Sequence, residues 1–226
     1  MILDGVQAVR ARIADACRRC GRSPERVRLI GVVKGRTVAQ VAALLAAGVH
    51  DVGGNYLQEA QAQRAAVGAA PSVRWHGIGH LQRNKARAAV ALFDVIHSVD
   101  SEPLAIALDR HVNTPHPLDV LVQVNVSGEA TKSGVSPAEV LALVGAVRRL
   151  PHLRLLGFMT MAPLADDPEE ARPHFRQLRQ LRDAIDPTLT ELSMGMSDDF
   201  AVAIEEGATM VRIGRALFAE QNARDQ

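Results

Sequence analysis

Aromatic residues are scarce in this chain of 226 residues, where five Phe, one Trp and one Tyr make up 3% of the sequence. A core built from this chain must therefore be mostly aliphatic, and the stacking side chains typical of single-strand nucleic-acid binders are few. Net charge is also nearly absent, at +1. No global field therefore directs the protein to nucleic acid or to a membrane surface, and we expect neither as a partner.

Long apolar runs are absent as well. None reaches the roughly 18 residues of a membrane-spanning helix. The first 20 residues carry Asp4, Arg10, Arg12 and Asp15 and lack the apolar segment of a secretory signal. We therefore expect a cytoplasmic protein, with a length that fits one barrel-sized domain.

Only two cysteines are present, Cys17 and Cys20. A C-x-x-C pair is redox-active in some proteins and forms half of a zinc site in others. Here the pair lies near the end of an expected helix, and no second Cys or His pair accompanies it. We interpret both residues as reduced thiols, because cytosolic disulfides are uncommon, and we predict no metal site.

Strand-like apolar runs alternate with helical patterns after a first helix over residues 3–20, which Gly21 ends. The expected strands are 28–33, 49–53, 73–78, 94–98, 118–126, 153–159, 189–193 and 209–213. The expected helices are 37–47, 56–67, 81–91, 101–112, 137–149, 168–185 and 198–206, with a short one from about 215. Eight βα units predict a closed (β/α)8 barrel. We expect one domain over residues 1–226, with a leading helix at 1–21 and the barrel at 28–218.

An open, doubly wound sheet is the alternative architecture. It is disfavoured because no G-x-G-x-x-G motif follows the first strand. Capping residues mark three helix starts, at Ser136-Pro137, Asp167-Pro168 and Ser197-Asp198-Asp199. Gly207 is expected to end the last of these helices.

Lys34 follows the apolar run that forms the first expected strand. In a barrel the C-terminal ends of the strands meet at one mouth, where active sites lie. A desolvated ammonium group loses its proton more readily than one in water. A neutral amine can attack an aldehyde and form a Schiff base. Lys34 is therefore the first candidate for chemistry.

The ends of strands seven and eight indicate an anion site. Ser197 offers a hydroxyl and opens an expected helix, and Gly214 allows close approach to the backbone. Barrels often bind phosphate after these two strands. Asp198 and Asp199 would repel a phosphate, so we expect them to point away from it.

Several other residues have a structural as well as a functional interpretation. His80 and His97 are either proton carriers or hydrogen-bonded structural residues, and the i,i+4 pair His76 and His80 lacks a third ligand for zinc. Core packing explains four alternating methionines more simply than contact with a cofactor: Met159, Met161, Met194 and Met196. We expect the basic residues to lie on solvated helix faces: Arg83, Lys85, Arg87 and the run 176–182.

Together these motifs resemble the YggS/PROSC family of pyridoxal phosphate homeostasis proteins. The matching stretches cover most of the chain in the expected order: 29–34, 53–59 (GGNYLQE), 75–85 (WHGIGHLQRNK), 96–101 (IHSVDS), 123–134 (QVNVSGEATKSG), 157–163 (GFMTMAP), 192–200 (LSMGMSDDF) and 211–218 (VRIGRALF). The resemblance implies a barrel like the N-terminal domain of bacterial alanine racemase. It also implies that pyridoxal 5′-phosphate (PLP) forms an internal aldimine with Lys34.

The same resemblance implies roles for nine more residues. Those near the phosphate, largely through backbone N–H groups, would be Ser197, Ile213, Gly214 and Arg215. Arg212 would face the pyridine nitrogen, and the residues lining the cofactor would be Asn55, His80, Ser193 and Met194. Two positions depart from the family pattern. Gly54 stands where the family usually has Glu, which removes a carboxylate beside the cofactor, and Val33 and Gly35 flank the lysine where Ser and Thr are usual.

Arg212 limits the chemistry that this resemblance allows. A guanidinium cannot accept a proton, so the pyridine nitrogen facing it stays unprotonated and the ring is a weaker electron sink. Racemases of this fold add a tyrosine from a further domain and a partner subunit, and Tyr56, the only tyrosine here, does not occupy an equivalent place. We expect a monomeric PLP carrier without robust catalytic activity, which holds PLP on Lys34 and delivers it to PLP-dependent apoenzymes.

Two other classes of function remain open. One is an enzyme, either a PLP-dependent racemase or lyase of the same fold or a cofactor-free Schiff-base aldolase. The other is an interaction module that uses the basic helix faces, which the near-neutral charge disfavours.

Overall fold

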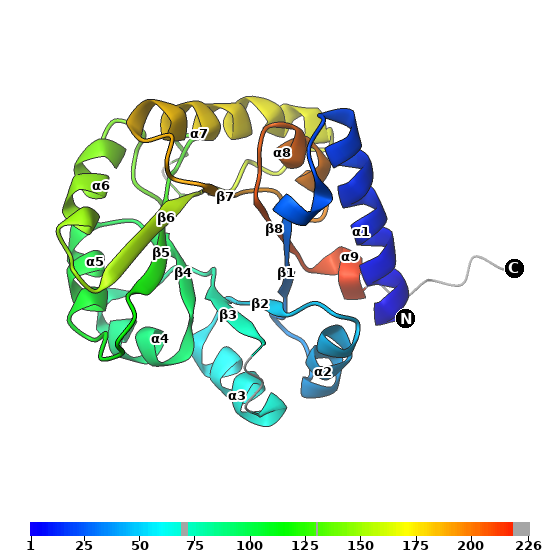
Figure 1. Cartoon of the computed structure of the whole chain (residues 1–226), viewed down its shortest axis with the longest axis horizontal. Helices are drawn as coiled ribbons and strands as arrows, with labels where there is room; N and C mark the ends of the chain where they lie inside the picture. Colours follow the sequence, from blue (N-terminus) through cyan, green and yellow to red (C-terminus); the bar gives the residue numbers. More distant parts are fainter. Residues whose placement is uncertain (69–71, 130, 219–226) are drawn as a thin grey trace, which may run out of the picture.

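The computed structural model describes residues 1–68, 72–129 and 131–218. Its parallel strands close into a barrel in chain order, with β8 pairing back to β1 (Figure 1). The strands are β1 (Arg28–Val32), β2 (Asp51–Gly54), β3 (Arg74–Gly77), β4 (Val95–Val99), β5 (Leu118–Gln123), β6 (Leu153–Met159), β7 (Glu191–Ser193) and β8 (Met210–Ile213). The predicted barrel is thus confirmed, with most strand ends within two residues of the expected positions.

Helices surround the strands, as Figure 1 shows. They are α1 (Ile2–Arg19), α2 (Val38–Ala46), α3 (Leu57–Val67), α4 (Ala86–Leu92), α5 (Glu102–Asp109), α6 (Val140–Arg148), α7 (Arg172–Ile185), α8 (Phe200–Glu205) and α9 (Arg215–Phe218). Short 3-10 helices precede β1, α4 and α7, and these are η1 (Pro24–Arg26), η2 (Arg83–Lys85) and η3 (Pro168–Ala171). No helix of the described residues is both long enough and apolar enough to cross a membrane.

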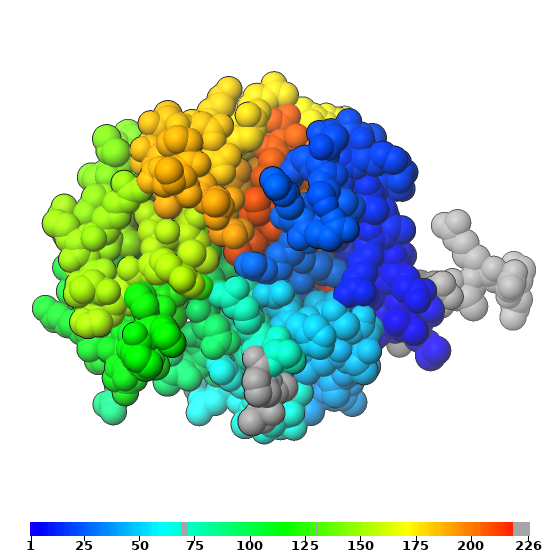
Figure 2. Space-filling model, in the orientation of Figure 1, coloured from blue at the N-terminus to red at the C-terminus, as the bar shows by residue number. Residues whose placement is uncertain are grey.

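Helix α1 lies outside the barrel, against α8 and α9, and forms one side of the molecule in dark blue (Figure 2). Its buried face carries Val6, Val9, Ile13 and Ala16 at helical spacing, so burial of this apolar stripe fixes the helix on the barrel. Gly21 follows with a φ of 68°, which ends the helix as predicted. Cys17 and Cys20 are both free thiols, in agreement with the sequence interpretation.

The capping assignment at Ser136 is wrong. The segment 137–139 forms a turn, and α6 begins at Val140. Ser136 donates its hydroxyl to the Glu139 carboxylate at 2.5 Å instead of capping the helix. By contrast, Asp167 does act as a cap, because its carboxylate accepts the Glu169 N–H at 2.9 Å. Gly207 follows α8 with a φ of 106°, so the predicted end of that helix is confirmed.

The basic run on α7 is not simply solvated. Arg172, Arg176 and Arg179 all donate to the carboxylate of Glu206, which directly follows α8 and is buried. This cluster joins α7 to α8. Arg176 and Arg179, which belong to the run predicted to be solvated, keep side-chain exposures of 51% and 37%, so they are solvated and also bind a buried carboxylate.

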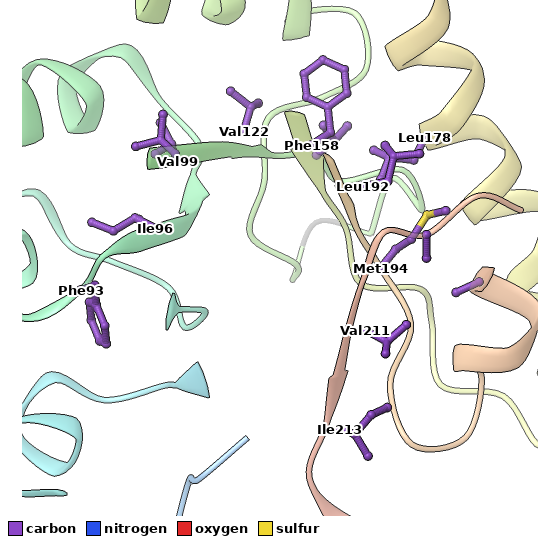
Figure 3. Close-up of a cluster of buried hydrophobic side chains, with 14 of the residues drawn as sticks. Phe93, Ile96, Val99, Val122, Phe158, Leu178, Leu192, Met194, Val211 and Ile213 are labelled. Carbon is purple, nitrogen blue, oxygen red and sulfur yellow. The ribbon is translucent and has the colours of Figure 1, made fainter. Parts of the chain in front are cut away.

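Most of the core is an aliphatic layer between the strands and the helices. Figure 3 shows part of it, with side chains from the strands and the residues next to them and with Leu178 from helix α7: Phe93, Ile96, Val99, Val122, Phe158, Leu178, Leu192, Met194, Val211 and Ile213. The interior of the barrel is different. It holds a small apolar cluster of Val95, Leu121 and Met159 together with buried polar side chains. The mouth is therefore underlain by polar groups instead of a closed apolar plug.

Candidate functional site

Lys34 lies in the turn that follows β1. Helix α3 braces this turn with two side chains one helical turn apart. Gln63 is buried and donates to the carbonyl oxygen of Val33 at 3.0 Å, and the Glu59 carboxylate accepts the N–H of Gly35. Gly35 has a φ of 69°, which suits a residue without a side chain. The backbone of the lysine is thus held in place by hydrogen bonds.

The side chain of Lys34 is exposed. The expected desolvation of its ammonium group is therefore wrong for this structure, because the turn carries Lys34 beyond the strand and out of the barrel interior. Its Nζ lies 5.4 Å from the centre of the Tyr56 ring. An aromatic face stabilises a nearby cation. Tyr56, which the sequence analysis left without a role, is thus a direct neighbour of the lysine.

Arg212 is buried at the inner end of the mouth. Its Nη1 donates to Ser193 Oγ at 2.7 Å, and its Nη2 donates to the carbonyl oxygen of Thr160 at 2.8 Å. Burial lowers the pKa of Arg212 to about 10, a shift that Asp199 partly opposes, so the guanidinium stays charged at neutral pH. The site therefore holds one fixed positive charge that can only donate hydrogen bonds.

Two buried histidines lie behind Ser193. His97 Nδ1 lies 2.9 Å from Ser193 Oγ, and His97 Nε2 lies 2.9 Å from His76 Nδ1. His76 Nε2 in turn lies 2.8 Å from the Asp51 carboxylate. Burial lowers the pKa of both histidines, more strongly for His97, so both rings are neutral at pH 7. The structural interpretation of His97 is therefore the better one, although the sequence did not reveal that it pairs with His76.

The predicted phosphate residues come together at the ends of β7 and β8. Ser197 Oγ accepts the N–H of Ala216 at 3.4 Å, so the two loops meet. Gly214 lies beside the end of β1, since a Cβ built there would stand 3.5 Å from Cβ of Val32. The side chain of Ile213 packs outward in the apolar layer (Figure 3), so only its backbone faces the mouth.

The expectation that Ser197 opens a helix is wrong. It begins a turn, and α8 starts at Phe200 with Asp199 as its cap. The Asp199 carboxylate accepts the N–H of Met196 at 2.6 Å, and Asp198 forms an exposed ion pair with Arg215. Both acids thus have partners of their own, which leaves the Ser197 hydroxyl and the loop backbone as the groups that can meet an anion.

Asn55 and His80 lie in a groove of about 700 Å³ between α3 and α4. The loops that carry them touch closely, because a Cβ at Gly79 would stand 2.2 Å from the carbonyl oxygen of Asn55. His80 is exposed and lies 3.5 Å from Asp100. Asn55 Oδ1 is buried without a hydrogen-bond partner among the described residues. Neither Lys34 nor Arg212 lines the groove, but Tyr56, the neighbour of Lys34, does.

Positions 194 and 54 both face the surrounding helices and not the mouth, contrary to expectation. Met194 is fully buried in the layer between strands and helices (Figure 3), and only its backbone remains available at the mouth. A Cβ at Gly54 would stand 2.8 Å from Cβ of Ala60 and 3.3 Å from the ring of Phe93, so a side chain there would start toward the helices.

The chain matches known proteins over most of its length. The family model for the alanine racemase N-terminal domain matches residues 6–222. The pyridoxal phosphate homeostasis protein of Pseudomonas aeruginosa is 44% identical over 226 residues, which cover 99% of this chain and 96% of that protein. The Escherichia coli K12 protein of the same name is 40% identical over 237 residues, with 99% and 97% covered.

This chain belongs to the family of pyridoxal phosphate homeostasis proteins.

Solved structures also match this chain over nearly its whole length. PipY of Synechococcus elongatus with PLP bound is 35% identical with a TM-score of 0.85, covering 97% of this chain and 100% of that one. The PipY structure without PLP is 36% identical with a TM-score of 0.87, and the match covers the same shares of the two chains. An alanine racemase of Corynebacterium glutamicum is 20% identical with a TM-score of 0.71, which shows a similarity of fold alone. The match covers 99% of this chain and 64% of the racemase. The family resemblance drawn from the motifs is confirmed.

Proposed function

We propose that this member of the pyridoxal phosphate homeostasis family holds PLP reversibly at the barrel mouth, as a Schiff base on Lys34. The main support is the arc formed by β7, β8 and β1. It places a lysine, a buried guanidinium and the Ser197 loop on three adjacent strands. The PLP-bound structure of PipY gives independent support, since that protein shares the whole barrel.

The residues present fit the chemistry of the cofactor. Ser197 and the backbone around Gly214 would hold the phosphate, because Asp198 and Asp199 each already have a partner. Arg212 would donate to the pyridine nitrogen and thereby keep it unprotonated. Asn55 Oδ1, which is buried without a partner, would accept from a donor of the ligand. When bound, the cofactor supplies an aldehyde whose carbon joins the Lys34 nitrogen with release of one water.

The same groups favour holding over catalysis. A ring nitrogen that faces a charged guanidinium is a poor electron sink. Lys34 is exposed at an open mouth, which suits exchange of the group it carries. We propose further that the protein acts as a cytoplasmic monomer and delivers PLP to apoenzymes. Light scattering of the purified protein tests whether it is a monomer. Delivery is tested by the rate at which an apoenzyme is loaded, which should be faster with the PLP-bound protein than with the same amount of free PLP.

A lysine-by-lysine labelling experiment tests the Schiff base. The chain contains only three lysines, Lys34, Lys85 and Lys132. Wild type and the variants Lys34→Arg, Lys85→Arg and Lys132→Arg would be incubated with PLP, reduced with borohydride and analysed by mass spectrometry. We expect yellow absorbance and one pyridoxyl adduct in every protein except Lys34→Arg. A colourless wild type, or an adduct that persists in Lys34→Arg, contradicts the assignment.

Incubation with L-amino acids in deuterated water separates the carrier from an enzyme. The carrier predicts slow exchange at Cα and no D-amino acid. Rapid exchange with a D-product would identify a racemase, and Tyr56 would then be the first residue to replace, since its ring lies beside Lys34.

A further inference from the structure

A continuous line of close polar contacts crosses the interior of the barrel. It runs from Arg212 near the mouth through Ser193, His97 and His76 to Asp51, the first residue of β2. The successive heavy-atom distances are 2.7, 2.9, 2.9 and 2.8 Å. Because Asp51 begins its strand and Ser193 ends another, the line connects the two ends of the barrel. Ser193 and both histidines are buried.

The two ends of this line fix its direction. A guanidinium only donates and a carboxylate only accepts. Asp51 therefore requires a proton on His76 Nε2, which leaves His76 Nδ1 as an acceptor. His97 must then carry its proton on Nε2 and donate it to His76. His97 Nδ1 is left to accept from the hydroxyl of Ser193, whose oxygen accepts from Arg212.

The opposite arrangement of neutral rings fails at Asp51. With its proton on Nδ1, His76 would direct a nitrogen lone pair at the carboxylate, 2.8 Å away. Two acceptors at that distance repel each other, and the burial of His76 leaves little water to intervene.

We propose that His97 and His76 are positioning residues, which aim the Ser193 hydroxyl away from Arg212 and thereby hold the guanidinium where it meets the ligand. The histidines touch no ligand themselves and act through Ser193. The tautomer assignment stands independently of any ligand, whereas the effect on PLP rests on the function proposed above.

One added proton reverses the line. A doubly protonated His76 donates to both Asp51 and His97, and His97 then carries its single proton on Nδ1 and donates to Ser193. The Ser193 oxygen now receives two donors, and its own hydroxyl proton loses the acceptor it had. Protonation near the far end of the barrel therefore changes the contact next to Arg212.

The charged groups around the pair decide when this occurs. Asp51 favours the proton, and its carboxylate lies 3.6 Å from Arg28 Nε. Arg28, Arg74 and Arg212 disfavour a positive charge on His97. Asp119, the acidic group on β5, is bound by Arg74 and Arg154. Cations thus dominate around the rings, and the reversed state belongs to acid pH.

Nuclear magnetic resonance of the ligand-free protein with 15N-labelled histidine tests the assignment directly. At pH 7.5 we expect both rings to carry their proton on Nε2, with signals identified by their loss in variants of His76 and His97. A proton on Nδ1 of either ring, or a doubly protonated ring, overturns the proposal.

Two substitutions at one position separate positioning from packing. In His97→Asn the amide oxygen can take the place of Nδ1 and accept from Ser193. In His97→Gln the amide nitrogen can take the place of Nε2 and donate to His76, but Ser193 loses its acceptor. We expect roughly tenfold weaker PLP binding by absorbance titration for His97→Gln and near-normal binding for His97→Asn. Equal losses indicate a packing role, and no loss in either refutes positioning.

Asp51 provides a second pair in case His97 variants do not fold, since its side chain is partly exposed. Asp51→Asn keeps an acceptor for His76 and should preserve both tautomers, whereas Asp51→Leu should let both rings change. Unchanged tautomers in Asp51→Leu refute the fixed direction. If wild type takes up no PLP but shows the Nε2 tautomers, the proposed function fails and the directed line stands.

Discussion

The buried amide of Gln63 donates to two carbonyl oxygens, that of Val33 at 3.0 Å and that of Arg36 at 2.9 Å. These acceptors lie on either side of Lys34 and Gly35. Helix α3 therefore sets the position of the lysine backbone, while the side chain remains exposed and free to exchange its partner. A rigid turn with an accessible amine suits a protein that must bind an aldehyde and release it again.

Replacement of Gln63 by Leu should loosen this turn. Two buried carbonyl oxygens lose their donor, so we expect a loss of about 2 kcal/mol in the free energy of unfolding, measured by urea denaturation. PLP uptake should also become slower in stopped-flow absorbance, because Lys34 loses its fixed backbone. Gln61→Leu on the same helix is the control, since Gln61 is exposed. Equal effects of the two substitutions would contradict a role for the hydrogen bonds.

Arg212→Met should separate stability from function. Burial disfavours the charge of Arg212, as the lowered pKa of about 10 shows. Its removal relieves that cost while it also removes two hydrogen bonds. We expect a free energy of unfolding equal to that of wild type or about 1 kcal/mol higher, together with at least tenfold weaker PLP binding. Arg149→Met, at an exposed ion pair with Glu102 on the outer helices, should change neither. A loss of several kcal/mol in Arg212→Met would identify Arg212 as a structural residue.

Stability should decline below about pH 6.5, the ordinary pKa of histidine. Burial lowers the pKa of His76 and His97 in the folded state, so the unfolded chain binds protons that the folded protein excludes. Their contribution is fully present above pH 6.5 and is lost as the pH falls toward the folded-state values. The slope approaches about 1.4 kcal/mol per pH unit for each histidine.

Urea unfolding between pH 7.5 and 5.5 measures this slope. His97→Asn should lower the slope by the contribution of one histidine, which is at most about 1.4 kcal/mol per pH unit. The exposed His50 provides the control, because His50→Gln removes no buried ring and should leave the slope unchanged. A wild-type stability that stays constant over this range would show that the histidines protonate freely in the folded state.

Glu206→Gln should weaken the junction of α7 and α8. The carboxylate is buried, which raises its pKa, but hydrogen bonds from Arg176, Arg172 and Arg179 outweigh burial and keep the pKa below its ordinary value. Loss of the charge leaves three arginines around a neutral amide. Because the arginines are partly exposed, we expect a moderate cost of about 2 kcal/mol. Thermal unfolding beside the exposed control Glu170→Gln tests this, and an equal Tm for both would refute it.

The order of the elements and the barrel were predictable from sequence alone. Both rest on local periodicity, which depends on residues a few positions apart. Lys34 at the end of the first strand and Gly214 at the end of the last were placed in the same way. A closed barrel then brings those two ends together, and the pairing of Gly31 with Ile213 at the ends of β1 and β8 confirms this consequence.

The surroundings of the site were decided by the tertiary structure. The exposure of Lys34, the outward direction of Met194 and the brace from Gln63 depend on how each loop leaves its strand and which helix packs beside it. The contact of His76 with His97 joins residues 21 positions apart on neighbouring strands. Local patterns carry no information on such pairs, because only the register of a closed sheet determines which inward side chains meet.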